Sequence, residues 1–303
     1  ESGSRHKTRV KRGIHFKQVP TAMIAILTFC AKSATLLPMT LTLPLLETER
    51  HGFAVLTLNR PEKRNPLSEE MIAALMNAFI RIETRRDIRA VILAAKGSVF
   101  SAGHDLKEMS AHRQDSDRGR AYFEEILSRC AALMQKIMMM PQPVIAAVEG
   151  VATAAGCQLV ASCDLAVAGE EARFATPGVH IGLFCSTPMV ALSRNVSRKH
   201  AMEMLLLGET VRAQDALRIG LVNYVVTEGD ALAHAEVMAR MIASKSPLTI
   251  SIGKRAFYEQ AEMKLSEAYR YASEVMVENM LARDAEEGIN AFIEKRDPQW
   301  SGS

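Results

Sequence analysis

The sequence predicts an α/β fold in which helices cover a parallel sheet. Short apolar runs rich in β-branched residues alternate with longer segments of helical periodicity through most of the chain. Helical segments then follow one another at the C-terminal end, which adds a helical region to the α/β pattern. The 303 residues are 48% hydrophobic and 23% charged. This composition is typical of a globular protein of about one or two domains.

Each predicted element follows from a local signal. His51-Gly52 marks a turn inside a strand pair over residues 44–59, whose second strand covers 53–58. Ser68 is a good N-cap for a helix that continues from Met71. Short apolar runs predict strands or extended segments at 90–95, 144–148, 165–168, 173–175 and 221–226. Helical spacing and flanking Gly or Pro predict helices at 122–140, 154–162, 187–195, 199–208, 213–219, 231–243, 247–259 and 265–294.

Charge, hydropathy and cysteine usage exclude several classes of protein. No run of 18 or more apolar residues occurs, so no membrane-spanning helix is expected. The net charge is +3, but without residues 1–38 the chain carries 30 Lys and Arg against 33 Asp and Glu, which does not indicate nucleic-acid binding. The cysteines are odd in number and lack CxxC spacing, so reduced, buried thiols are predicted rather than disulfides or a metal site. They are Cys30, Cys130, Cys157, Cys163 and Cys185.

Residues 1–38 are interpreted as a basic, disordered leader outside the fold. They hold seven Lys and Arg and one acid, Glu1, and the next acid is Glu47. An acid-poor basic leader is typical of mitochondrial transit peptides, and a basic stretch before the short apolar run 22–30 is typical of secretory signals, which the cysteine usage disfavours. The alternative is an extension ahead of a start at Met39. The expected location is the mitochondrial matrix if the leader is a transit peptide, and the cytoplasm if the protein is bacterial.

Two loops that directly follow predicted strands, called strand exits below, have the same kind of composition. Residues 100–105 follow the predicted strand 90–95, and residues 149–156 follow the predicted strand 144–148. Both are rich in small residues, which let a ligand approach the backbone and leave N–H groups free to point at it. The second exit also begins a helix, whose positive end favours an anion. Two converging N–H groups would form an oxyanion hole, while the alternative is two tight strand exits without a ligand.

Six collinear motifs resemble the enoyl-CoA hydratase/isomerase (crotonase) family over roughly residues 45–300. The motifs are LNRPEKRN at 58–65, FSAGHDLKEM at 100–109, AGCQL at 155–159 with CD at 163–164, FATP at 174–177, AQDA at 213–216 with GLV at 220–222, and AFIEKR at 291–296. The resemblance implies a repeated ββα spiral core over 39–240. It also implies a helical region, 241–303, that packs on a neighbouring subunit in a homotrimer or a dimer of trimers.

The resemblance further implies an acyl-CoA thioester as the ligand, in fatty acid metabolism, with no separate cofactor because CoA is part of the substrate, and with no metal. The backbone amides of His104 and Ala155 are expected to form the oxyanion hole that stabilises a thioester enolate. Pro66 stands where the family often has Ala and removes one backbone donor. The residues expected to contact CoA or substrate are Lys63, Arg64, Ala102, His104, Asp105, Leu106, Lys107, Ala155, Gly156, Phe292 and Lys295.

The chain departs from the family at the two acid/base positions, where hydratases carry a pair of glutamates. Here these positions are Gln158 and Gly178. A glutamine amide can orient water but cannot take its proton, and glycine can do neither. Each general acid–base group contributes about 10² to 10⁴ in rate, so hydration of a short 2-enoyl-CoA is expected to be weak or absent. Groups that could substitute are the side chains of His104, Asp105, His180, Cys185 and Ser186.

Three functions therefore stay open at the level of sequence. The first is a hydratase-like lyase or isomerase with weak or atypical activity, or a decarboxylase or thioester hydrolase of the same fold. The second is a non-catalytic acyl-CoA binder, which the residues Gln158 and Gly178 favour. The third is a purely structural oligomer. The small residues at 101–103 and 154–156 speak for a ligand and against the third function.

Overall fold

Two sheets organise the computed structural model, which describes residues 43–303. The larger sheet has the strand order β1-β2-β3-β5-β7-β10, in which β1 runs antiparallel to β2 and every other neighbouring pair is parallel. Its strands are β1 (Leu45–Arg50), β2 (Phe53–Leu58), β3 (Ala90–Ala95), β5 (Val144–Val148), β7 (Leu165–Gly169) and β10 (Tyr224–Val226). The smaller sheet has the order β4-β6-β8-β9 and consists of β4 (Val99–Ser101), β6 (Val151–Thr153), β8 (Arg173–Ala175) and β9 (Val211–Arg212).

The chain winds as a spiral, because successive turns contribute one strand to each sheet. β3 is followed by β4, β5 by β6 and β7 by β8, and in each case the first strand belongs to the larger sheet and the second to the smaller one. Helices connect one turn to the next. This arrangement confirms the predicted α/β spiral with a parallel sheet. β4 and β6, which the sequence did not predict, have only three residues each.

The helices follow the predicted order, and the structure corrects one predicted helix and one predicted strand. They are α1 (Glu69–Glu83), α2 (Leu106–Ala111), α3 (Arg120–Met139), α4 (Ala155–Ser162), α5 (Pro188–Asn195), α6 (Arg198–Leu207), α7 (Ala213–Ile219), α8 (Ala231–Ala243), α9 (Pro247–Gln260), α10 (Leu265–Met280) and α11 (Arg283–Glu294), with 3₁₀ turns η2 (Pro61–Lys63), η3 (His112–Gln114) and η4 (Pro177–Ile181). The predicted cap is confirmed, since the Ser68 hydroxyl accepts from the Met71 amide at 3.2 Å. The helix α2 was not predicted.

Both corrections have a local physical reason. The single helix predicted over 265–294 is wrong: Ala282 is extended (φ −70°, ψ 144°) and separates α10 from α11, which turns back to pack on α9. The strand predicted over 221–226 is too long. The amides of Leu221 and Val222 donate to the Ala216 carbonyl and complete the end of α7, so only β10 pairs with β7.

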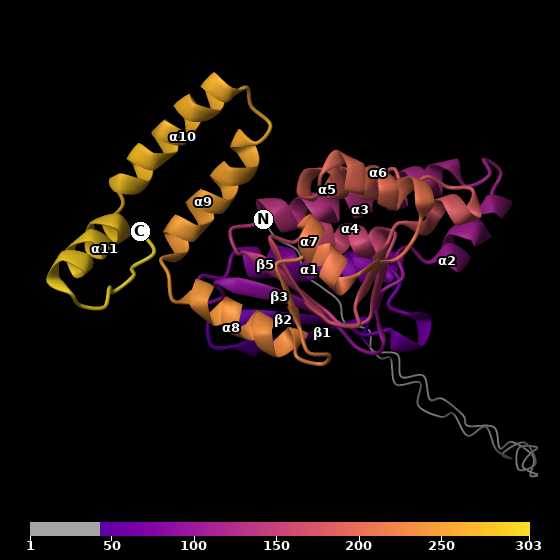
Figure 1. Ribbon diagram of the computed structural model, residues 1–303, viewed down its shortest axis with the longest axis horizontal. Helices are drawn as coiled ribbons and strands as arrows, with labels where there is room; N and C mark the ends of the chain where they lie inside the picture. The colour runs from indigo at the N-terminus through magenta and orange to yellow at the C-terminus, as the bar shows by residue number, and fades with distance from the viewer. Residues whose placement is uncertain (1–42) are drawn as a thin grey trace, which may run out of the picture. The chain divides into compact units, whose positions relative to one another are not determined.

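Helices cover the larger sheet on both faces, as Figure 1 shows for α8 beneath the strands and α1, α3 and α4 on the other side. On α8, Ala231, Ala235 and Ala239 recur every fourth residue, are buried, and lie against β3, β5 and β7. Small side chains at this spacing let the helix approach the sheet closely. The opposite face holds the larger apolar cluster, which includes Phe79, Phe100 and Phe174.

The helices α9, α10 and α11 extend away from the sheets (Figure 1). They pack mainly on one another, and α9 also contacts α3. No helix within residues 43–303 is long and apolar enough to cross a bilayer. The predicted leader, residues 1–38, and Cys30 lie outside the described residues.

Candidate active site

The two strand exits singled out in the sequence lie at one edge of the smaller sheet. β4 pairs in parallel with β6, so their carboxyl ends lie side by side. The first exit runs from β4 through Gly103 and His104 into α2, and the second runs from β6 through Ala154 into α4. The exits therefore follow short strands of the smaller sheet, not the longer strands of the larger sheet that the sequence indicated.

Glycines allow these exits to touch. A Cβ added to Gly103 would lie 3.1 Å from the Ala155 nitrogen and 3.0 Å from the Ala154 Cβ. A Cβ added to Gly156 would lie 2.2 Å from the Ser101 carbonyl oxygen, a separation that no pair of atoms tolerates. Close contact between the two backbones thus explains both glycines, and it places the residue before His104 directly against Ala155.

The amides of His104 and Ala155 donate no hydrogen bond to any residue of the described chain. Ala155 is the first residue of α4 and is buried, so its N–H is one of the donors that a helix start leaves without an intrahelical partner. Ala154, before it, has φ +50° and ψ −120°, a conformation that strains an L-residue. Both amides are therefore available as donors to a ligand.

The residues around His104 are held by α2 and by the turn at 63–67. Asp105 caps α2, because its Oδ1 accepts from the amides of Lys107 at 3.0 Å and Glu108 at 3.2 Å. This carboxylate is therefore engaged in holding the helix start. The side chains of Leu106 and Lys107 are exposed, and Ala102 is half-buried.

The turn before α1 is tied to the first strand exit by backbone hydrogen bonds. The Arg64 carbonyl accepts from the Ala102 amide at 3.0 Å, and the Leu67 amide donates to the Gly103 carbonyl at 2.8 Å. Arg64 and Asn65 are left-handed, while the side chains of Lys63 and Arg64 are exposed. Asn65, which the sequence analysis did not single out, is fully buried and donates to the carbonyls of Lys96 and Val99.

The His104 ring is fixed and uncharged. Its Nδ1 lies 3.2 Å from the Leu67 carbonyl oxygen, so Nδ1 carries the proton and donates it. Burial lowers the pKa of His104 below its usual value, and the hydrogen bond to Leu67 offsets only part of this effect. The other nitrogen, Nε2, is buried and has no partner among residues 43–303.

Gln158 and Gly178 differ in their surroundings. Gln158 lies in the fully buried helix α4, and its Oε1 is buried without a partner in the described chain. Gly178 is buried in η4, and its carbonyl accepts from the Leu183 amide at 2.9 Å. Position 158 therefore offers an unused acceptor, whereas position 178 offers no side chain.

All cysteines of the described chain are free and buried, as predicted. Burial raises the pKa of Cys130 and of Cys157 to about 12, and it also raises the pKa of Cys163 and Cys185. These thiols stay protonated near neutral pH, which makes them poor nucleophiles. Within residues 43–303, no three His, Cys, Asp or Glu side chains gather as metal ligands.

Phe292 and Lys295 are not brought to the strand exits within one chain. Both belong to the end of α11, which lies far from α2 and α4 in Figure 1. Phe292 is 85% exposed. A contact between these residues and a ligand at His104 would need a second subunit.

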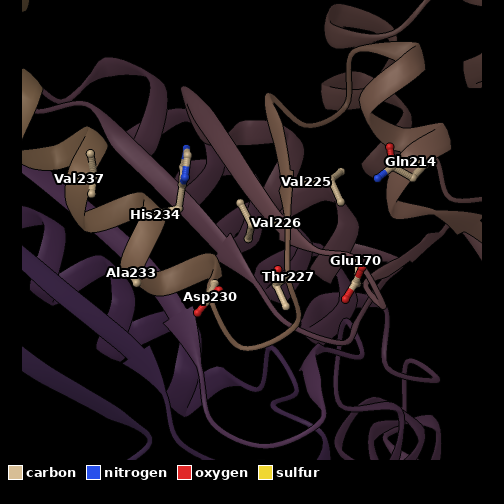
Figure 2. Close-up of a pocket in the computed structure, with 9 residues that line it drawn as sticks. All are labelled: Glu170, Gln214, Val225, Val226, Thr227, Asp230, Ala233, His234 and Val237. Carbon is tan, nitrogen blue, oxygen red and sulfur yellow. The ribbon is translucent and has the colours of Figure 1, made fainter.

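A cavity of about 680 Å³ lies elsewhere, between α7 and α8 along β10. Figure 2 shows Val225, Val226 and Thr227 at its base, with Gln214 on one side and His234 on the other. None of the predicted site residues lines it. The candidate site therefore rests on the strand exits and not on this cavity.

Comparisons with known proteins agree with this fold. The family model described as enoyl-CoA hydratase/isomerase matches residues 48–303. The chain is 47% identical over 255 residues to enoyl-CoA hydratase domain-containing protein 3, mitochondrial, of Xenopus laevis, covering 84% of this chain and 85% of that one. The crystal structure of the human enoyl coenzyme A hydratase domain-containing protein 3 is 46% identical with a TM-score of 0.80, over 85% of this chain and 100% of that one. A Mycobacterium smegmatis enoyl-CoA hydratase structure is 50% identical with a TM-score of 0.80, over 85% and 98%. The chain therefore belongs to the enoyl-CoA hydratase/isomerase family, whose members carry the crotonase fold.

Proposed function

We propose that this protein binds acyl-CoA thioesters and holds the thioester oxygen between the backbone amides of His104 and Ala155. The observation that supports the proposal is the close approach of Gly103, the residue before His104, to the Ala155 nitrogen, together with the absence of a hydrogen-bond partner for either amide within residues 43–303. Fixed donors of this kind stabilise negative charge that develops on an oxygen, and the start of α4 adds its positive dipole end. A thioester enolate carries its charge on that oxygen.

Hydration of a 2-enoyl-CoA is not the reaction that this site supports best. The positions of the family's two glutamates hold Gln158 and Gly178, so neither offers a carboxylate to take or deliver a proton. Losing one such group costs about 10² to 10⁴ in rate. Turnover of crotonyl-CoA is therefore expected to fall far below the roughly 10 per second that is typical of enzymes.

A second candidate is a non-catalytic acyl-CoA binder, which the same substitutions favour. Incubation with a panel of enoyl-, saturated and 2-carboxyacyl-CoA thioesters, followed by mass-spectrometric detection of products, separates the two candidates. Binding of acetyl-CoA by calorimetry without any product from the panel supports the binder. Rapid hydration of crotonyl-CoA contradicts the expectation that Gln158 and Gly178 make hydration slow, and it also contradicts the non-catalytic binder.

The oxyanion hole is tested by Ala155→Pro. Proline is tolerated at the first position of a helix, and it removes the N–H while its ring fills the space in front of that donor. We expect the affinity for acetyl-CoA to fall at least about 10-fold, a loss of about 1.4 kcal/mol. The melting temperature shows whether α4 still folds, since Ala154 before the proline is already strained. Unchanged affinity in a folded variant rules out this role for Ala155.

We also propose a homotrimer, or a dimer of trimers, in which Phe292 and Lys295 of one subunit contact the CoA of another. The exposure of Phe292 and the distance of α11 from the strand exits support this arrangement. Sedimentation velocity measures the assembly. The variant Phe292→Ala, which removes no buried contact within one chain, should weaken acetyl-CoA binding only in the assembled protein.

Mitochondrial targeting by residues 1–38 is proposed on two grounds. The segment is basic and acid-poor, and similar proteins from several vertebrates carry the word mitochondrial in their names. Fusion of this segment to a fluorescent reporter tests the proposal, with a version in which its Lys and Arg are replaced by Gln as the control.

A further inference from the structure

The space that a side chain at position 178 would need is already filled. A Cβ added to Gly178 would lie 2.7 Å from the Leu183 carbonyl oxygen and 2.9 Å from the Cys185 Sγ. The chain from η4 folds back to create this contact, because the Leu183 amide donates to the Gly178 carbonyl at 2.9 Å. The first carbon of any side chain at position 178 would therefore meet atoms that are already in place.

Cys185 is held in this place from two sides. Cys185 is only 8% exposed, and its Sγ lies 2.9 Å from the place of a Cβ on Gly178. On the other side lies Cys157, whose pKa is raised by burial and by the neighbouring Cys185. Cys157 directly precedes Gln158 on α4.

The two positions are nevertheless not equivalent. Gln158 is 4% exposed and keeps an acceptor, Oε1, without a partner in the described chain. A buried unpaired acceptor is costly unless a ligand or water satisfies it. Position 158 is therefore open to a ligand group, whereas position 178 is closed by Leu183 and Cys185.

Building on the proposed function, we propose that Cys185 is a specificity-determining residue, whose thiol occupies the place of an acid side chain at position 178 and excludes hydration of 2-enoyl thioesters. The proposal predicts that residues 178 and 185 are coupled. A side chain at 178 should be accommodated less well while the sulfur stays at 185, because the sulfur adds a second close contact to that of the Leu183 carbonyl.

A thermodynamic cycle tests the coupling without reference to activity. Gly178→Ala should lower the melting temperature by about 5 °C, because overpacking of a buried site costs about 1–3 kcal/mol. In a Cys185→Ala background the same change should cost about half as much, since one of the two close contacts is gone. Cys185→Ser keeps an atom at the sulfur position and should give little relief. Equal costs in all three backgrounds would overturn the proposal.

An activity test uses Gln158→Glu with Gly178→Glu, made with and without Cys185→Ala. We expect crotonyl-CoA hydration to be higher in the triple variant than in the double variant, by less than the about 100-fold at the lower end of what one acid–base group contributes, because the Leu183 carbonyl still lies 2.7 Å from a Cβ at position 178. Equal hydration in the two variants contradicts the proposal. If acetyl-CoA does not bind the unaltered protein, the proposed function is wrong. The thermodynamic cycle would still measure the coupling between residues 178 and 185.

Discussion

The spiral core and the C-terminal arm, defined as residues 247–303, differ in how far they bury their apolar side chains. The core buries its apolar residues completely, with Phe79, Phe100 and Phe174 at 0% exposure. In the arm, α9 and α10 contain no buried residue, and Leu265, Leu281 and Phe292 are each more than 75% exposed. One chain therefore completes its own core but leaves apolar side chains of the arm exposed.

Hydrogen bonds and an ion pair join the arm to the core. Lys254 of α9 donates to the carbonyls of Ile137 and Gln142 and to Asp164, at 2.7–2.9 Å, and the Tyr258 hydroxyl donates to the same carboxylate. Asp284 of the arm accepts hydrogen bonds from Ser246, the residue directly before the arm, and from Ser301 and Gly302 within it. Such directional bonds set an orientation without requiring much buried area.

The largest expected effect on the free energy of unfolding comes from a substitution at Gly156 of the core, and Gly253 of the arm provides the contrast. Gly156→Ala should prevent folding or cost more than about 4 kcal/mol, because its Cβ would lie 2.2 Å from the Ser101 carbonyl oxygen. Gly253→Ala on α9 meets nothing within 4 Å and should stabilise the helix by about 0.5–1 kcal/mol. Urea unfolding measures both. A mild effect of Gly156→Ala would show that the strand exits are not in close contact.

The next largest effect on stability is expected from the polar contacts of Asp164 that link the arm to the core. Lys254→Met should cost about 3–5 kcal/mol, since it leaves Asp164 buried without its charged partner. Tyr258→Phe removes one hydrogen bond to the same carboxylate and should cost about 1.5–3 kcal/mol. Equal stability of the Lys254 variant and the unaltered protein in urea unfolding would mean that the anchor does not hold the arm.

The sequence predicted the fold well where apolar runs are long. The strands 90–95 and 144–148 and the helix 231–243 match β3, β5 and α8, because their periodicity reflects burial in the final fold. β4 and β6 were missed since three residues carry no period, and the break at Ala282 was missed since neither it nor Leu281 is a helix breaker. Tertiary packing of α11 on α9 decides that break.

The candidate site was predicted only in part. The loop residues around His104 and Ala155 stood out by small size and by resemblance, and the structure brings them together. The packing of Cys185 against Gly178 could not be read from the sequence, because it depends on how residues 178–185 fold back. Burial of Asn65 was likewise hidden, although an asparagine that follows a turn is a common bridging residue.

A third prediction addresses the exposed surface of the arm. Leu281→Glu should leave the stability of one chain nearly unchanged, because this side chain is 77% exposed. If a second copy covers it, the substitution should weaken association by about 1.5–3 kcal/mol per contact, the value of one buried leucine. Sedimentation equilibrium measures this dissociation, with Glu278→Gln as a control on the same helix. Identical assembly of the two variants would show that the arm surface around Leu281 is not an interface.

The smallest effect is a pH dependence of opposite sign in the two regions. At the edge of the core, burial and the nearby Glu228 raise the pKa of Glu149, although the amides of Ala231 and Gly229 oppose the shift. In the arm, burial opposes ionisation of Asp284, but hydrogen bonds from Ser246 and Ser301 prevail and lower its pKa.

The contribution of Glu149 to the stability of the fold is present below the ordinary glutamate pKa of about 4.3 and is lost as pH rises through the raised value. The Asp284 contribution is present above about 3.9 and is lost as pH falls through the lowered value. Glu149→Gln should therefore gain stability relative to the unaltered protein as the pH rises above about 4.3, the ordinary glutamate pKa. Asp284→Asn should be less stable than the unaltered protein by a constant amount at neutral pH, and this difference should shrink as the pH falls below about 3.9. Parallel melting curves of Glu149→Gln and the unaltered protein above about pH 4.3 would show that Glu149 ionises normally, and that the contrast between the two carboxylates does not exist.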